Sequence, residues 1–139
     1  MIPTAVNKLV LAGIVISIII GTILAFGGNS LDKQILADTF SVSAVYYPDE
    51  KMVEITYDDN SNGTTLVTLE LLGMRESFQK KYDTSSFSEK VPLSKPPQYG
   101  WSSIPVTFLI EHNELGQIRL KTEISPVGEP PARVIYSKP

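Results

Sequence analysis

Six consecutive residues, Asp58 to Gly63, have the types and spacing that open a calcium-binding loop. The segment reads DDNSNG, so Asp58, Asn60 and Asn62 fall at the first, third and fifth positions and Gly63 falls at the sixth. Calcium prefers such oxygen ligands, and the glycine permits a sharp turn. The twelfth position should supply a bidentate glutamate, but it holds Leu69. We therefore expect a polar hairpin loop without a bound metal, with calcium binding as the alternative.

The same loop contains a sequon for N-glycosylation. Asn62, Gly63 and Thr64 match the acceptor pattern Asn-x-Ser/Thr. Modification of Asn62 requires that the loop lie outside the cytoplasm, and a chance match is the alternative.

Other residues with catalytic potential lack the necessary neighbours. His112 is the only histidine and lies in a turn-like segment, so we interpret it as an exposed turn residue. Ser94 and Lys95 precede two prolines and fit neither a nucleophile elbow nor a Ser-x-x-Lys helix. We therefore expect no catalytic residue, no cofactor and no enzymatic activity.

A stiff aromatic loop is the remaining candidate for binding. Residues 95–101 read KPPQYGW, which places Tyr99 and Trp101 beside a Pro-Pro pair. Large amphipathic rings are favoured at protein interfaces. Tyr99 and Trp101 therefore either form a partner surface or, in the alternative that we favour, close one end of the domain with Trp101 buried.

An uncharged apolar segment is predicted to anchor the domain that carries these residues to a bilayer. Leu9 to Phe26 would span roughly 27 Å as a helix, which is close to the hydrocarbon thickness. Small residues recur in it every fourth position, on one side of the helix, a pattern typical of close packing with another transmembrane helix, of this chain or of a different subunit. These residues are Gly13, Ser17, Gly21 and Ala25.

The flanks of this segment predict its orientation. Lys8 precedes it without any acid, so the positive-inside rule places residues 1–8 in the cytoplasm and the C-terminal domain outside. A cleaved signal peptide ending near Gly27 is the competing interpretation, and it places the domain on the same side. Residues 27–38 would then be a stalk or linker, either loose or with a short helix over 31–37.

From residue 39 onward, the hydrophobic pattern changes to a period of two. Alternation and turn residues predict seven or eight short strands, which suit an antiparallel, immunoglobulin-like β-sandwich over 39–139. The predicted strands cover 40–46, 52–57, 67–71, 77–82, 87–93, 104–111, 117–124 and 133–137. The chain has no cysteine and a net charge of −3, which argue against disulfides and against nucleic-acid binding.

The layout resembles that of uncharacterised archaeal single-pass membrane proteins with an extracytoplasmic β-sandwich. The apolar segment, the GGNS break at 27–30 and the run VEITYDDNSNGTTLVTLELLG at 53–73 carry this resemblance. The resemblance implies no activity.

These features predict a non-catalytic, membrane-anchored interaction module, an accessory subunit of a larger membrane or cell-envelope complex. Its expected partners are the lipid bilayer, another transmembrane helix and an extracytoplasmic protein. A pilin-like filament subunit and an anchored ligand- or calcium-binding domain are the alternatives.

Overall fold

The computed structural model describes residues 32–139. The chain divides into two compact units, Met1–Asp32 and Lys33–Pro139, and the second is the β domain. The predicted cytoplasmic tail 1–8 and transmembrane helix 9–26 lie outside the described residues. Within 32–139, no helix has the length and apolarity needed to cross a membrane.

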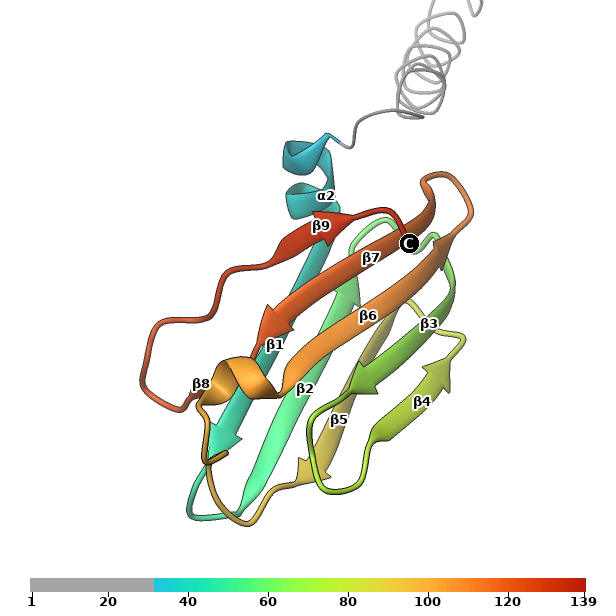
Figure 1. The fold of residues 1–139 in the computed structure, drawn as a ribbon. Coiled ribbons are helices and arrows are strands. Elements are labelled where there is room, and N and C mark those ends of the chain that lie inside the picture. Colours follow the sequence, from blue (N-terminus) through green and yellow to red (C-terminus); the bar gives the residue numbers. More distant parts are fainter. Residues whose placement is uncertain (1–31) are drawn as a thin grey trace, which may run out of the picture. The chain divides into compact units, whose positions relative to one another are not determined.

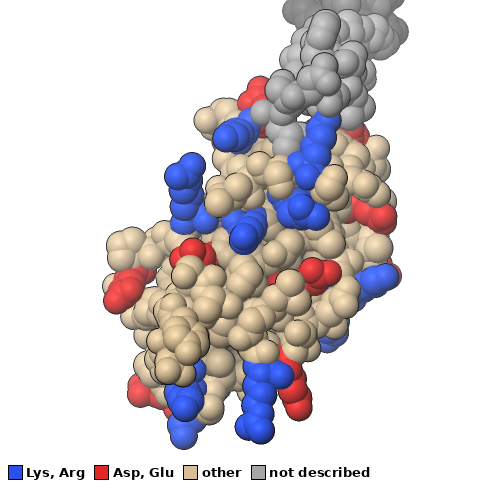
Figure 2. All heavy atoms as spheres, viewed as in Figure 1, with Lys and Arg blue, Asp and Glu red and all other residues tan. Residues whose placement is uncertain are grey.

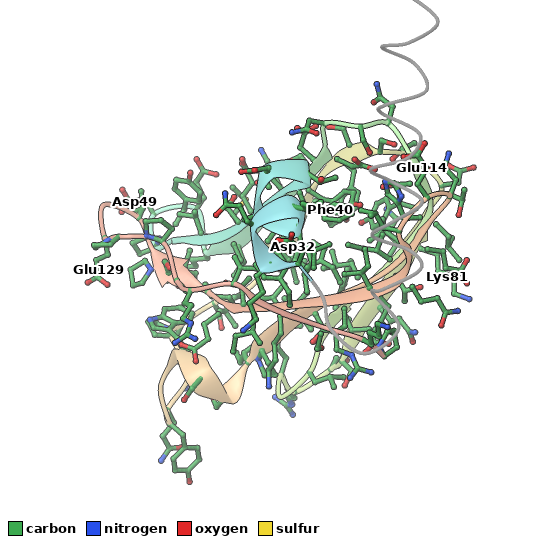
Figure 3. The ribbon with its side chains drawn as sticks, turned by 90° about the horizontal axis from the view of Figure 1, so that it is seen from above. Asp32, Phe40, Asp49, Lys81, Glu114 and Glu129 are labelled. Atoms are coloured by element: carbon green, nitrogen blue, oxygen red, sulfur yellow. The ribbon has the colours of Figure 1, made fainter. Side chains whose placement is uncertain are left out.

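A short helix, α2 (Lys33–Thr39), opens the domain. Its Leu36 is buried, and the Thr39 hydroxyl donates to the carbonyl oxygen of Ile35 at 2.7 Å. Seen from above, α2 and Phe40 lie between the two sheets (Figure 3). The short helix predicted for the stalk is therefore present two residues later than expected, and it packs on the β domain.

Two sheets form a β-sandwich, as the alternating sequence predicts (Figure 1). The first has the strand order β5-β2-β1-β8 and the second has the order β4-β3-β6-β7-β9. The strands are β1 (Phe40–Tyr47), β2 (Met52–Asp59), β3 (Thr64–Leu71), β4 (Phe78–Tyr82), β5 (Ser86–Pro92), β6 (Pro105–His112), β7 (Gly116–Glu123), β8 (Ser125–Pro126) and β9 (Ile135–Ser137). A 3-10 turn, η1 (Trp101–Ser103), precedes β6.

The core forms because every second side chain of the long strands faces the opposite sheet. Tyr57 of β2 stacks on Phe108 of β6 with ring centroids 5.9 Å apart, which joins the two sheets at their centre. The fully buried aliphatic side chains around this pair follow the predicted alternation. They include Val53, Ile55, Val67, Leu69, Leu71, Val106, Ile110, Ile118 and Leu120.

All strand pairs are antiparallel except β1 with β8, which is parallel. Because of this, the connections after β1, β3, β5 and β7 lie at the end of the sandwich away from α2, which we call the distal end. Residues 32–139 contain nine strands instead of seven or eight. The additional one is β8, whose two residues, one of them a proline, give no alternating signal.

Candidate functional site

A buried polar cluster occupies the end of the sandwich beside α2. Val53, Ile55 and Tyr57 point into the core, so the alternation of β2 also directs its last residue, Asp59, inward. The Asp59 side chain is 0% exposed, and the His112 side chain, at the end of β6, is 1% exposed. The cluster therefore joins the first sheet to the second.

Hydrogen bonds surround the Asp59 carboxylate. Its Oδ1 accepts from the backbone N–H and hydroxyl of Ser61 at 2.9 and 2.6 Å. Its Oδ2 accepts from the Thr64 hydroxyl at 2.6 Å and from the Gly63 N–H at 3.1 Å, and lies 3.3 Å from Nε2 of His112. Burial raises the pKa of Asp59, but the hydrogen bonds from Ser61 and Thr64 outweigh it and leave the pKa below its usual range.

The tautomer of His112 follows from its contacts. The backbone N–H groups of Glu114 and Leu115 both donate to Nδ1, each at 3.1 Å. Nδ1 is therefore an acceptor, and the proton of the neutral ring is on Nε2. That proton points toward Oδ2 of Asp59 and toward the Ser61 hydroxyl oxygen, which lies 2.9 Å from Nε2.

Further contacts extend this cluster into the core. The Tyr57 hydroxyl lies 2.7 Å from Oγ1 of Thr64, and burial raises the pKa of Tyr57 and keeps it protonated. Because Thr64 donates to Asp59, Tyr57 donates to Thr64 in turn. Phe40 packs edge-on against the His112 ring, with centroids 5.7 Å apart. A Cβ atom on Gly63 would lie 2.5 Å from that ring, so only glycine fits there.

Ser61, His112 and Asp59 are the residue types of a hydrolytic triad, but their connections differ from one. In a triad, the serine hydroxyl donates to histidine and the carboxylate holds the other ring nitrogen. Here the Ser61 hydroxyl donates a hydrogen bond to Asp59 and accepts one from Nε2–H of His112. Nδ1 of His112 accepts from backbone N–H groups of the β6–β7 turn. His112 cannot accept the Ser61 proton in this arrangement. The hydrogen bonds of the cluster instead connect the two sheets.

The predicted calcium ligands do not converge on this cluster. Asn60 donates its side-chain N–H to the carbonyl oxygen of Asp38, and Asp58 and Asn62 are exposed. Asp59, between the proposed ligands, is the residue that the loop encloses. Among residues 32–139, no group of three or more acidic, histidine or cysteine side chains is placed to hold a metal ion.

The other predicted site residues are placed as follows. Asn62 is exposed on the β2–β3 loop with a φ of 57°, whereas Thr64 of the sequon is buried, with its hydroxyl donating to Asp59. Tyr99 is 82% exposed, whereas Trp101 is half-buried against Tyr46, with ring centroids 5.2 Å apart. The helix-packing residues Gly13, Ser17, Gly21 and Ala25 lie outside the described residues.

The interpretation of His112 as an exposed turn residue is wrong, because it is the last inward-facing residue of β6. Sequence reasoning also missed Asp59, although the alternation of Val53, Ile55 and Tyr57 already directs that position inward.

Comparisons of the chain with protein-family models, curated proteins and solved structures found no match.

Three exposed apolar side chains lie on the distal loops, which we define as residues 72–77, 93–104 and 127–130. Leu72 is 48% exposed, Tyr99 is 82% exposed and Val127 is 49% exposed. The first two of these loops approach each other closely, since a Cβ on Gly73 would lie 1.9 Å from the carbonyl oxygen of Ser103. Of the four large apolar side chains exposed in residues 32–139, these three share the end away from α2.

Proposed function

We propose that the chain is a membrane-anchored, extracytoplasmic interaction module that holds a protein partner with the distal loops of its β-sandwich. It would serve as an accessory subunit of a larger membrane or cell-envelope complex. The observation that carries this proposal is the separation of the two ends of the domain: α2, which follows the proposed anchor in sequence, lies at one end, and Leu72, Tyr99 and Val127 are exposed at the other.

The apolar sequence of Leu9–Phe26 supports the anchor. Lys8 favours a cytoplasmic N-terminus, and with it an extracytoplasmic domain. In such an arrangement, loops at the distal end are the part of the domain that a second protein reaches most easily. Tyr99 suits that role, because tyrosine is enriched among residues that dominate binding energy at interfaces.

The strand order supports the immunoglobulin-like assignment. In that fold, strands A, B and E share one sheet, and strands C, F and G share the other. Here β1, β2 and β5 lie in one sheet, and β3, β6 and β7 lie in the other, with β4 beside β3. Loops at one end of such sandwiches commonly carry binding surfaces, although the fold by itself implies no function.

The buried polar cluster gives less support to a catalytic function. The Ser61 hydroxyl donates to the Asp59 carboxylate, whose lowered pKa makes it a weak base, and His112 cannot take the proton because its Nε2 is protonated and its Nδ1 accepts from two N–H groups. Nucleophilic catalysis requires an effective base next to the hydroxyl. The cluster instead stabilises the end of the sandwich to which α2 is attached.

Photo-crosslinking in cells that produce the full-length chain tests this proposal. A benzophenone side chain replaces Tyr99, and a matched chain carries it at Glu114, an exposed residue of the β6–β7 turn at the end of the sandwich that carries α2. We expect one extracytoplasmic protein to be joined to position 99 and not to position 114. Adducts of equal yield at both positions, or none at 99, would contradict the proposal. An adduct between two copies would favour the pilin-like alternative.

A binding measurement gives the second test. Once the crosslinked protein is identified, Tyr99→Ala should weaken its affinity for the full-length chain at least tenfold, about 1.4 kcal/mol. Glu114→Ala should leave the affinity unchanged.

A further inference from the structure

One face of the domain carries basic side chains close to α2. Arg119 and Lys121 point outward from β7, where the register pairs them with Ser137 and Ile135 of β9. Lys33 of α2 and Arg133, just before β9, extend this group, which we call the basic face. Figure 2, in the view of Figure 1, shows Lys and Arg gathered over this part of the second sheet.

A groove between α2 and the chain before β9 brings two of these residues together. Lys33, Gln34 and Ala37 line it on one side, and residues 133–136 line it on the other, around a volume of about 290 Å³. Its walls therefore combine the Lys33 ammonium and the Arg133 guanidinium with apolar surface. Ile135 lies in this wall and is 53% exposed.

The four members of the basic face are not neutralised by ion pairs within residues 32–139. The ion pair between Lys80 and Glu89 involves none of them. The acids on the outer face of β6 and β7 are Glu111 and Glu123, each toward one end of its strand. Arg119 and Lys121 therefore leave a local excess of positive charge between these two acids, although Asp32 and Asp38 flank Lys33 and the whole chain has a net charge of −3.

The length of the tether determines which surface this face can meet. Only six residues lie between Phe26, the end of the apolar segment, and Lys33. Fully extended, the chain from Phe26 to Lys33 reaches at most about 25 Å. If the segment is an uncleaved anchor, as proposed above, the part of the domain beside α2 stays close to lipid headgroups.

We propose that the basic face binds anionic phospholipid headgroups of the bilayer that anchors the chain. Arg119, Lys121, Arg133 and Lys33 contact headgroup phosphates, and the exposed Ile135 inserts between them. Arginine suits such contacts because its planar group donates two hydrogen bonds to one phosphate. The domain then contacts the membrane through β7 and β9, and Tyr99 at the distal end stays accessible.

This inference depends on the anchor of the proposed function, and its test separates the two. The chain has no cysteine, so one introduced cysteine takes a single fluorophore. The probe is attached at Gln117→Cys, an exposed outward position of β7 two residues from Arg119. The full-length protein is reconstituted into two kinds of vesicle, both containing phosphatidylcholine with a spin-labelled headgroup. In one kind, about a third of the lipid is anionic phosphatidylglycerol; the other contains none. Quenching of the probe reports contact with the headgroups.

We expect the probe to be quenched in the anionic vesicles and little in the neutral ones. Salt at about 1 M should abolish the quenching, because the Debye length is then only about 3 Å and the attraction between the charges is screened. Neutralising two charges with Arg119→Gln and Arg133→Gln should weaken the contact about 25-fold, since each basic residue near an anionic surface contributes about fivefold. The matched control is Lys90→Gln with Lys95→Gln, which removes the same charge from exposed positions elsewhere and should keep the quenching.

Equal quenching in neutral vesicles, or in the arginine double variant, would overturn the inference. Release by millimolar inorganic phosphate at constant ionic strength would also overturn it, because it would indicate a site for a free anion. Flotation of the protein with the vesicles reports on the anchor separately. A protein that floats but is not quenched contradicts only the headgroup contact, whereas one that does not float contradicts the anchor.

Discussion

Nε2 of His112 lies 3.3 Å from Oδ2 of Asp59, and this contact joins the last residue of β2 in one sheet to the last residue of β6 in the other. Both side chains are almost completely buried. A buried carboxylate is stable only while its hydrogen bonds are intact. The stability of the end of the sandwich beside α2 therefore depends on a few polar atoms.

Asp59→Asn should destabilise the 33–139 unit by about 2–4 kcal/mol. The amide presents N–H groups where the carboxylate oxygens accept from Ser61, Gly63 and Thr64. Urea unfolding followed by circular dichroism measures the loss. Asp58→Asn, on the exposed neighbour, is the matched control and should change stability by less than about 0.5 kcal/mol.

The same carboxylate makes stability depend on acid. The pKa of Asp59 is lower in the folded protein than its ordinary value of 3.8. Its contribution is therefore fully present above about pH 4 and is lost as the pH falls through the lower, folded-state pKa. Melting temperatures of the wild type and Asp59→Asn, measured from pH 7 to pH 2.5, should converge on acidification. A constant difference over that range would show that the ionised carboxylate is not the source.

Gly63→Ala should destabilise the domain by about 1–3 kcal/mol, because its Cβ would lie 2.5 Å from the His112 ring. A double-mutant cycle supplies the control. In a His112→Ala background the clash with the ring is absent, so the same substitution should cost much less. An equal cost in both backgrounds would mean that the glycine is needed for another reason, such as its approach to Asn113.

Calcium should not raise the melting temperature of the domain. The Asn60 side chain is held by the carbonyl group of Asp38, and the loop closes on Asp59 instead of on an open space. Calcium at 100 times its dissociation constant would add about 2.7 kcal/mol, which calorimetry detects easily. Magnesium at the same ionic strength is the control, and a shift seen only with calcium would revive the calcium-binding alternative.

The small-residue stripe predicts where a second membrane helix packs. Gly21→Ile should weaken association of the 9–26 segment, because a bulky side chain separates the helix backbones. Ile19→Leu, on another face, should not weaken it, and both variants keep the segment apolar. A transmembrane association assay measures self-pairing, and co-purification of the full-length chain detects a different partner. Unchanged results with Gly21→Ile would mean that the stripe is ordinary membrane composition.

Much of the fold was predictable because alternation is strong where one side of a strand is buried. Val53, Ile55 and Tyr57, and then Ile118, Leu120 and Thr122, indicate both the strands and their inward faces. The pairing of strands was harder to predict from the sequence. For example, β5 pairs with β2 across about 30 intervening residues, and no local sequence signal indicates this pairing. The short β8 is held by its backbone pairing with Val45 and Tyr46, which its own sequence does not reveal.

The polar cluster was missed for a different reason. DDNSNG has the composition of an exposed loop, and Asp and His are usually exposed in turns. Only the register of β2 and β6 shows that Asp59 and His112 face inward and toward each other. A polar residue that continues the inward positions of a strand is therefore a useful signal for a buried site.

The parallel pairing of β1 with β8 has a consequence for folding. Val45 lies opposite Ser125, so this edge of β1 is completed only by residues about 80 positions later in the chain. Contacts between residues so distant in sequence form slowly, because a long loop must close before they stabilise the chain. During synthesis, β1 keeps one unpaired edge until Ser125 and Pro126 have been made. An exposed edge of this kind favours pairing with other chains, so truncation before Ser125 should promote aggregation.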